Sequence, residues 1–121
     1  MKVFIYFNLH KKCWSIKALE GDDKGRVIAH AVSFVMSNCT TKVSEAGRQR
    51  VLREKRKNVH AGIVGQLQRH SMHMELPADL QMSNKLSYNP YKGATFFDVS
   101  TNEPVLKADT VVGCNRTVYY A

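Results

Sequence analysis

Alternation of apolar and polar residues with a period of two is the feature that most restricts the fold of this chain. In residues 2–7, the odd-numbered apolar residues fall on one face of an extended chain, and Phe4 and Tyr6 fall on the other. Residues 14–18 repeat the alternation, and the polar residues 8–12 between the two segments have turn character. The first part of the chain is therefore predicted to form a β-hairpin.

The same pattern recurs along most of the remaining sequence. Further strands are predicted at residues 26–36, 59–67, 95–99, 104–106, 110–112 and 117–120. In the first of these, Ile28, Val32, Phe34 and Met36 are expected to share one face. The chain is therefore predicted to be mainly β.

Two segments interrupt this pattern in different ways. Gly62 and Gly65 either weaken the strand predicted at residues 59–67 or mark a bulge in it. Residues 68–84 are rich in methionine, contain Pro77 and have no clear period, so a loop with a short helix is expected there.

The length and the composition indicate one small domain spanning residues 1–121. A chain of 121 residues with 44% hydrophobic residues can bury a core. We expect a mainly β (α+β) fold, either a curved antiparallel sheet or a small barrel, with one or two short helices.

The location of the protein is predicted from what surrounds its longest apolar run. Residues 3–7 are too few to span a bilayer, and no cleavage site for a signal peptide follows them. The three cysteines, Cys13, Cys39 and Cys114, are widely spaced and odd in number, which favours free thiols. The sequence therefore predicts a cytoplasmic protein without membrane contact.

Positive charge is concentrated in residues 42–60. Between residues 42 and 57, seven basic residues face only two acids, Glu45 and Glu54, in a chain whose formal net charge is +8. The basic residues are Lys42, Arg48, Arg50, Arg53, Lys55, Arg56 and Lys57. Such a cluster repels itself unless an anionic partner neutralises it, so nucleic-acid binding is predicted beside the alternative of an ordinary solvated surface.

The local structure of the basic stretch has two interpretations. Ser44 is a plausible N-cap with Glu45 in the first turn, and a helix would place Val51 and Leu52 inward and spread the arginines over an outer face. Alternatively, residues 48–52 and 58–64 would form the two arms of a hairpin. The helix is favoured because no strong turn residue lies at the hairpin tip.

A second candidate contact lies around a predicted turn at residues 88–92. Tyr88 and Tyr91 flank Asn89-Pro90, and Lys92 follows them. Tyrosines at a turn beside a lysine can stack on nucleic-acid bases, although they can equally hold a turn against a sheet. With Asn58, which ends the basic run, these residues complete the predicted binding site.

The sequence gives weak signals for metal binding and for catalysis. His70 and His73 have the i, i+3 spacing that brings two imidazoles together on a helix, but no cysteine or carboxylate completes a ligand set. A nuclease would use residues such as Asn58, His60, Arg53 and Tyr88, yet the acids show no paired spacing. We expect no metal or other cofactor and no enzymatic activity.

Four segments resemble short proteins of tailed phages and prophages. They are KGRVIAHA (24–31), EAGRQRVLREKRKNVHAGIVG (45–65), YNPY (88–91) and NEPV (102–105). The resemblance transfers no catalytic residues, and it implies a small accessory protein that acts inside a bacterium. Such proteins commonly bind DNA or RNA. The alternative is an inhibitor, of the anti-restriction or anti-CRISPR type, whose basic face docks on an acidic or nucleic-acid-binding host enzyme or defence complex.

Overall fold

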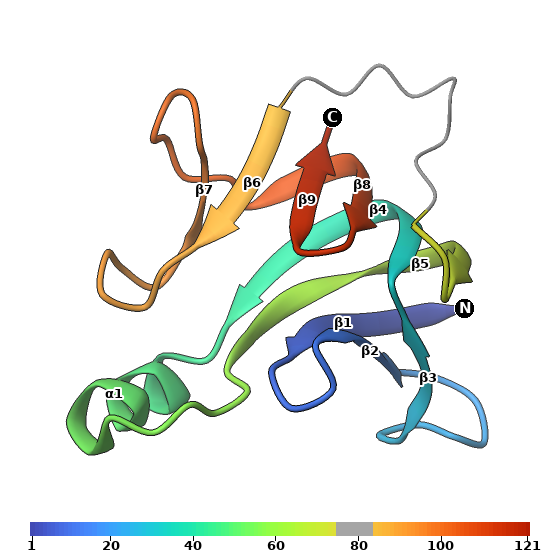
Figure 1. The fold of residues 1–121 in the computed structure, drawn as a ribbon, viewed down its shortest axis with the longest axis horizontal. Coiled ribbons are helices and arrows are strands. Elements are labelled where there is room, and N and C mark those ends of the chain that lie inside the picture. Colours follow the sequence, from blue (N-terminus) through green and yellow to red (C-terminus); the bar gives the residue numbers. More distant parts are fainter. Residues whose placement is uncertain (75–83) are drawn as a thin grey trace.

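An antiparallel sheet of nine strands organises the computed structural model, which describes residues 1–74 and 84–121 (Figure 1). Along the sheet the strand order is β3-β2-β1-β5-β4-β8-β9-β6-β7. The strands are β1 (Lys2–Asn8), β2 (Cys13–Ala18), β3 (Val27–Ala31), β4 (Ser33–Val43), β5 (Ala61–Ser71), β6 (Asn84–Tyr88), β7 (Phe96–Asp98), β8 (Lys107–Cys114) and β9 (Thr117–Tyr120), and the one helix of the described residues is α1 (Glu45–Glu54). The predicted single mainly β domain is confirmed as a curved sheet. The barrel alternative was wrong because β3 and β7, the two edge strands, do not pair with each other.

The predicted first hairpin is confirmed. Phe7 faces Trp14 and Ile5 faces Ile16 across the β1–β2 pair. These side chains point to one face, and Trp14 makes edge contacts with the rings of Phe7 and Phe34 at centroid distances of 5.2 and 5.1 Å. The indole Nε1–H donates a hydrogen bond of 2.7 Å to the carbonyl oxygen of Asn115 in the β8–β9 turn, so this hairpin is tied to the far end of the chain.

The single strand predicted at residues 26–36 was wrong, because the chain breaks it at Val32 into β3 and β4. β3 pairs with β2, whereas β4 lies between β5 and β8, so the chain has to change direction between them. The N–H of Val32 donates to the Ser71 oxygen at 2.8 Å, and its carbonyl accepts from the N–H of Asn115 at 2.9 Å. As a result Ile28 remains 39% exposed, and only Phe34 and Met36 of the expected face are fully buried.

Strand β5 differs from its prediction at both ends. It begins at Ala61 rather than at residue 59, and Val59 is exposed. It continues to Ser71, so the loop expected from residue 68 was wrong for residues 68–71; the part of that prediction covering residues 75–83 lies outside the described residues.

The bulge predicted near the glycines of β5 is confirmed at Gly65. Between the pairs Ser37–Gln66 and Thr40–Val64, β4 has two residues where β5 has only Gly65. Asn38, one of the two, adopts a left-handed backbone with φ of 51°. A Cβ atom at position 65 would lie 2.9 Å from the Ser37 oxygen, which explains the glycine.

The C-terminal strands follow the predicted pattern with two exceptions. β6 was not predicted, and it begins at Asn84, a residue that was expected in a loop. β7, β8 and β9 contain residues predicted as strand, but residues 104–106 do not form one. Pro104 makes a single bridge to Phe97, since proline has no N–H to extend the ladder, and Leu106 is 63% exposed.

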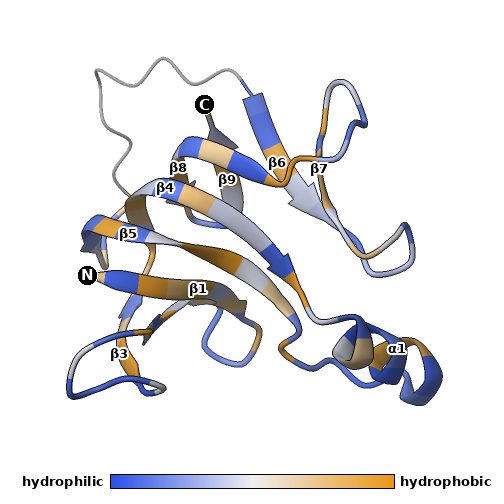
Figure 2. Cartoon of the chain, turned by 180° about the vertical axis from the view of Figure 1, so that it is seen from behind, coloured by the Kyte–Doolittle hydropathy of each residue, from blue (hydrophilic) through white to orange (hydrophobic). Residues whose placement is uncertain are grey.

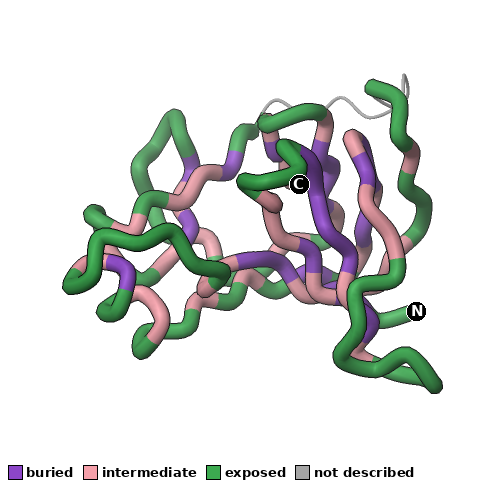
Figure 3. Tube along the Cα trace, turned by 60° about the horizontal axis from the view of Figure 1, so that its bottom comes forward, coloured by how far each residue is buried: buried purple, intermediate pink, exposed green. Residues whose placement is uncertain are grey.

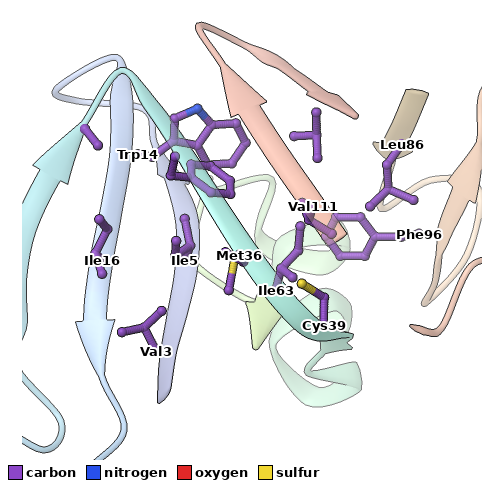
Figure 4. Packing of buried hydrophobic residues seen from close by; sticks show 13 residues of the cluster. Val3, Ile5, Trp14, Ile16, Met36, Cys39, Ile63, Leu86, Phe96 and Val111 are labelled. Carbon is purple, nitrogen blue, oxygen red and sulfur yellow. The ribbon is translucent and has the colours of Figure 1, made fainter. Parts of the chain in front are cut away.

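The core fills the concave side of the curved sheet (Figures 3 and 4). It joins residues of the N-terminal strands, such as Ile5 and Ile16, to Val111, Leu86 and Phe96 of the C-terminal strands. Phe34 lies so close to the β8 backbone that a Cβ atom on Gly113 would be 2.2 Å from its ring. The two halves of the chain therefore share one core.

A glycine-to-alanine pair tests this close approach. We expect Gly113→Ala to lower the free energy of unfolding by about 1–3 kcal/mol, because the methyl group overpacks the core against Phe34. Gly93→Ala is the matched control: no atom lies within 4 Å of its Cβ position, and its stability should stay within about 0.5 kcal/mol of the wild type. Urea unfolding of the three proteins measures both values, and equal stability of the two variants would contradict the packing.

The cysteines give a second test of the fold. All three are free thiols; Cys13 and Cys39 are buried and Cys114 is partly exposed. Burial raises the pKa of Cys39 to about 11, so its reactive thiolate is scarce at neutral pH.

We expect Cys114 to be alkylated first in the native protein and all three cysteines to be modified after denaturation without reductant. Mass spectrometry of peptides after iodoacetamide treatment measures this order. Rapid native labelling of Cys39 would contradict its burial.

Candidate nucleic-acid interface

The basic stretch forms helix α1, as favoured by the sequence, and the hairpin alternative was wrong. The Ser44 hydroxyl accepts a hydrogen bond of 3.2 Å from the N–H of Gly47. Glu45 lies in the first turn, where its negative charge interacts favourably with the helix dipole. The helix ends at Lys55, whose backbone is left-handed with φ of 56° and whose N–H donates to the Val51 oxygen.

Helix α1 projects beyond the ends of β4 and β5 rather than covering the sheet (Figures 1 and 2). Val51 is its only buried residue, while Leu52, also predicted to point inward, is partly buried. Gly47 packs closely against the Cβ atom of His60, since a Cβ atom on this glycine would be 2.7 Å from it. Few apolar contacts hold the helix, so polar contacts contribute much of its attachment.

Two of these polar contacts join α1 and the segment after it to the 88–92 turn. The Nε–H of Arg48 donates to the carbonyl oxygen of Pro90 at 2.8 Å. The Tyr88 hydroxyl is 2.6 Å from Nε2 of His60, and the Nδ1 of that ring is 2.9 Å from the Asn58 oxygen. The backbone carbonyl oxygen of Asn58 can only accept, so Nδ1 carries the proton. In the neutral ring Nε2 then accepts a hydrogen bond from the Tyr88 hydroxyl. The structure thus brings together the two predicted parts of the site.

Arg48 was wrongly predicted to belong to the outer cationic face. Its side chain is only 15% exposed and also forms a salt bridge of 2.9 Å with Glu45. Hydrogen bonds from Gln49 and Arg48 lower the pKa of the Glu45 carboxyl, with the Arg48 charge adding to the effect. Arg48 therefore positions the helix against the turn.

The other predicted cations lie on the surface. They are Lys42, Arg50, Arg53, Lys55, Arg56 and Lys57, and we call this set the basic surface. Within residues 1–74 and 84–121, Arg48–Glu45 is the one salt bridge, so none of the six pairs with a carboxylate of that part of the chain. Of the two acids in the stretch, Glu45 pairs with Arg48, which leaves Glu54.

Helical geometry separates this surface from the 88–92 turn. At 3.6 residues per turn, Arg50 points about 160° away from Arg48 around the helix axis, and Arg53 about 140° away. Because Arg48 faces Pro90, the arginines of the basic surface point away from the turn. Lys55, Arg56 and Lys57 continue the surface into the exposed segment before β5.

The residues predicted around the turn have different environments. Tyr88 is half-buried, and its pKa is raised mainly by burial, with Glu45 adding to the rise and Arg48 opposing it. Tyr91 is 73% exposed. Lys92 donates to the Asn102 side chain and lies 3.9 Å from the centre of the Phe97 ring, so local contacts already engage its charge.

Asn58 and His60 serve the connection between α1 and β5. The Asn58 side-chain oxygen accepts from the N–H of Val59 at 2.8 Å. Of the residues that the sequence offered for a nuclease site, the structure brings His60 and Tyr88 within hydrogen-bond distance of each other.

The helical spacing that made His70 and His73 weak metal candidates does not occur in the structure. His70 lies in β5, where side chains three residues apart point to opposite faces, and His73 follows the strand. In the part of the chain that the structure describes, no three residues among His, Cys, Asp and Glu gather to hold a metal ion.

Comparison with known proteins identifies the family. The family model of the Mycobacterium phage L5 gene 82 protein matches residues 1–121. The gene 82 protein of Mycobacterium phage L5 is 45% identical to this chain over 117 residues, covering 92% of this chain and 88% of that protein. The chain belongs to this family. The predicted resemblance to phage proteins is confirmed, and neither description names an activity or a partner.

Other comparisons add no further assignment. No solved structure matches the chain. Among the described residues, no helix has the length and apolar character to cross a membrane.

A matched pair of arginine variants tests the two environments in α1. We expect Arg48→Met to lower the free energy of unfolding by about 1–2 kcal/mol, because it removes the donor to Pro90 and the partner of Glu45. Arg50→Met makes the same chemical change at an exposed site and should cost less than about 0.5 kcal/mol. Thermal unfolding of both proteins measures the difference; equal losses would show that Arg48 does not anchor the helix.

Proposed function

We propose that this protein binds nucleic acid through phosphate contacts made by the basic surface. The observation that carries the proposal is that its six cations are exposed while no carboxylate of the described residues pairs with them. A cluster of exposed lysine and arginine side chains attracts anionic partners, and the phosphates of nucleic acid form a dense array of anions.

The attachment of α1 supports the same proposal. Arg48 is neutralised by Glu45 and anchors the helix to Pro90. Within the described residues, the neighbouring Arg50 and Arg53 form no salt bridge and no side-chain hydrogen bond. Exposed cations that repel one another reduce stability slightly, and a bound polyanion removes this cost. The arrangement therefore separates one structural arginine from a set that is available to a partner.

The same surface could serve a second role within the proposal. An inhibitor that docks on an acidic or nucleic-acid-binding host enzyme or defence complex would present the same cations to its target. Membership of a phage family is compatible with both roles, and both would operate in the host bacterial cytoplasm without a catalytic step by this chain.

Charge reversal tests the proposal directly. The double variant Arg50→Glu/Arg53→Glu should weaken binding to DNA and RNA at least about tenfold, because it adds two acids where two bases stood. If the wild type contacts about four or five phosphates of duplex DNA, a plot of log K against the logarithm of the salt concentration should have a slope of about −4. Fluorescence anisotropy at several salt concentrations measures both quantities.

The matched control makes the same change of charge elsewhere. Lys24 and Arg26 are exposed in and beside the turn before β3, so Lys24→Glu/Arg26→Glu should retain most of the affinity. Equal losses in the two double variants would indicate an effect of net charge alone and would count against a localised surface.

A pull-down from bacterial lysate separates the two roles. Recovery of nucleic acid that nuclease treatment abolishes supports direct binding. A host protein that is retained after nuclease treatment, and is lost in the Arg50→Glu/Arg53→Glu variant, would instead favour the inhibitor.

A further inference from the structure

Strand β1 places two aromatic side chains on the face of the sheet opposite the core. Val3 and Ile5 of this strand are fully buried in the core cluster, so the intervening Phe4 and Tyr6 point to the other face. Both are partly exposed and neither belongs to the core cluster. Their ring centroids are 5.8 Å apart with an angle of 33° between the planes.

The neighbouring strand supplies the space in which these rings lie. A Cβ atom on Gly62 of β5 would be 2.5 and 2.6 Å from two carbons of the Phe4 ring. The ring therefore lies across the β5 backbone, where only a glycine leaves room for it. We call the pair Phe4 and Tyr6 the aromatic platform.

Lysines surround the aromatic platform through the register of the sheet. Lys17 of β2 is directly opposite Phe4, and Lys42 of β4 is directly opposite Gly62. Side chains that face each other across adjacent strands share one face of the sheet, so both lysines lie on the side of the platform.

The charge of these strands has one sign. The sequences of β1, β2, β4 and β5 contain no aspartate or glutamate, whereas they contain Lys2, Lys17, Lys42 and Arg69. On these four strands the face combines partly exposed aromatic rings with positive charge, and it is complementary to a ligand that combines flat apolar rings with negative charge.

The platform is also continuous with the proposed interface. Lys42 belongs to the basic surface and lies two residues before the Ser44 N-cap of α1. Helix α1 projects beyond the ends of β4 and β5 and does not lie over β1 (Figures 1 and 2).

We propose that Phe4 and Tyr6 stack on unpaired bases, so that the preferred ligand of this protein is single-stranded nucleic acid. The proposal rests on the proposed function and narrows it. Base faces are available to aromatic side chains in single strands, whereas in a duplex they are stacked on one another. Lys17 and Lys42 contact the phosphates that flank the stacked bases, and the basic surface extends the contact along the strand.

Two substitutions at one position test the stacking. Tyr6→Leu keeps an apolar side chain on the sheet but removes the ring, and Tyr6→Phe keeps the ring but removes the hydroxyl. We expect Tyr6→Leu to weaken binding of a fluorescent 15-mer of thymidine or uridine about fivefold or more, and Tyr6→Phe to bind as the wild type does. Binding of both variants to a duplex of the same length should be unchanged.

A control variant removes an aromatic ring outside the platform. Tyr119 is partly exposed on β9, which contributes neither to the basic surface nor to the platform, and Tyr119→Leu should leave binding of the 15-mers unchanged if the stacking occurs on β1. Circular dichroism and thermal unfolding check that each variant is folded, and Phe4→Leu provides a second test should Tyr6→Leu fail to fold.

The outcomes separate this inference from the proposed function. Wild-type binding of single strands by Tyr6→Leu and Phe4→Leu, together with a loss in Arg50→Glu/Arg53→Glu, would overturn the platform and leave the basic surface standing. Preference of the wild-type protein for duplex over single strands would also overturn it. Absence of binding of any nucleic acid by the wild type at low salt would contradict both proposals.

Discussion

The pairing of β4 with β5 on one side and β8 on the other is the constraint on which the rest of the structure depends. These two ladders join the N-terminal strands to the C-terminal strands, and β4 also ends at the N-cap of α1. The bend at Val32, held by Ser71 and Asn115, lets the same chain segment serve both the edge strand β3 and this central position. The hydrogen bond from Trp14 to the Asn115 oxygen reinforces the connection between the two halves.

This architecture explains where the positive charge of the molecule is located. Residues 44–60 connect β4 to β5 at the end of the sheet, so the structure needs only a few anchors there: Val51, Arg48 and the His60–Tyr88 hydrogen bond. The remaining side chains of the connection make no contribution to the core. The core does not require their positive charge. The adjacent strands β1, β2, β4 and β5 contain no acidic residue, so the positive character extends onto the sheet.

The sequence predicts local features well and long-range contacts poorly. Alternation located most strands, and Ser44 with Glu45 located the start of α1, because these signals depend on neighbouring residues. The burial of Arg48 depends on Pro90, which is 42 residues away, and no local pattern encodes it. The alternation placed Phe4 on the face opposite Val3 and Ile5, but its place over a glycine depends on the pairing of β1 with β5.

The central claim is that nucleic acid contacts the basic surface, and chemical-shift mapping of the backbone amides tests it most directly. A ¹⁵N-labelled protein titrated with a thymidine 15-mer should show its largest shift changes at residues 50–57, with further changes at residues 4, 6, 17 and 42 of the adjoining sheet face. The amides of β7, β8 and β9 should change little, since these strands contribute to neither surface. Saturable changes confined to β6–β9, with residues 50–57 unaffected, would contradict the account.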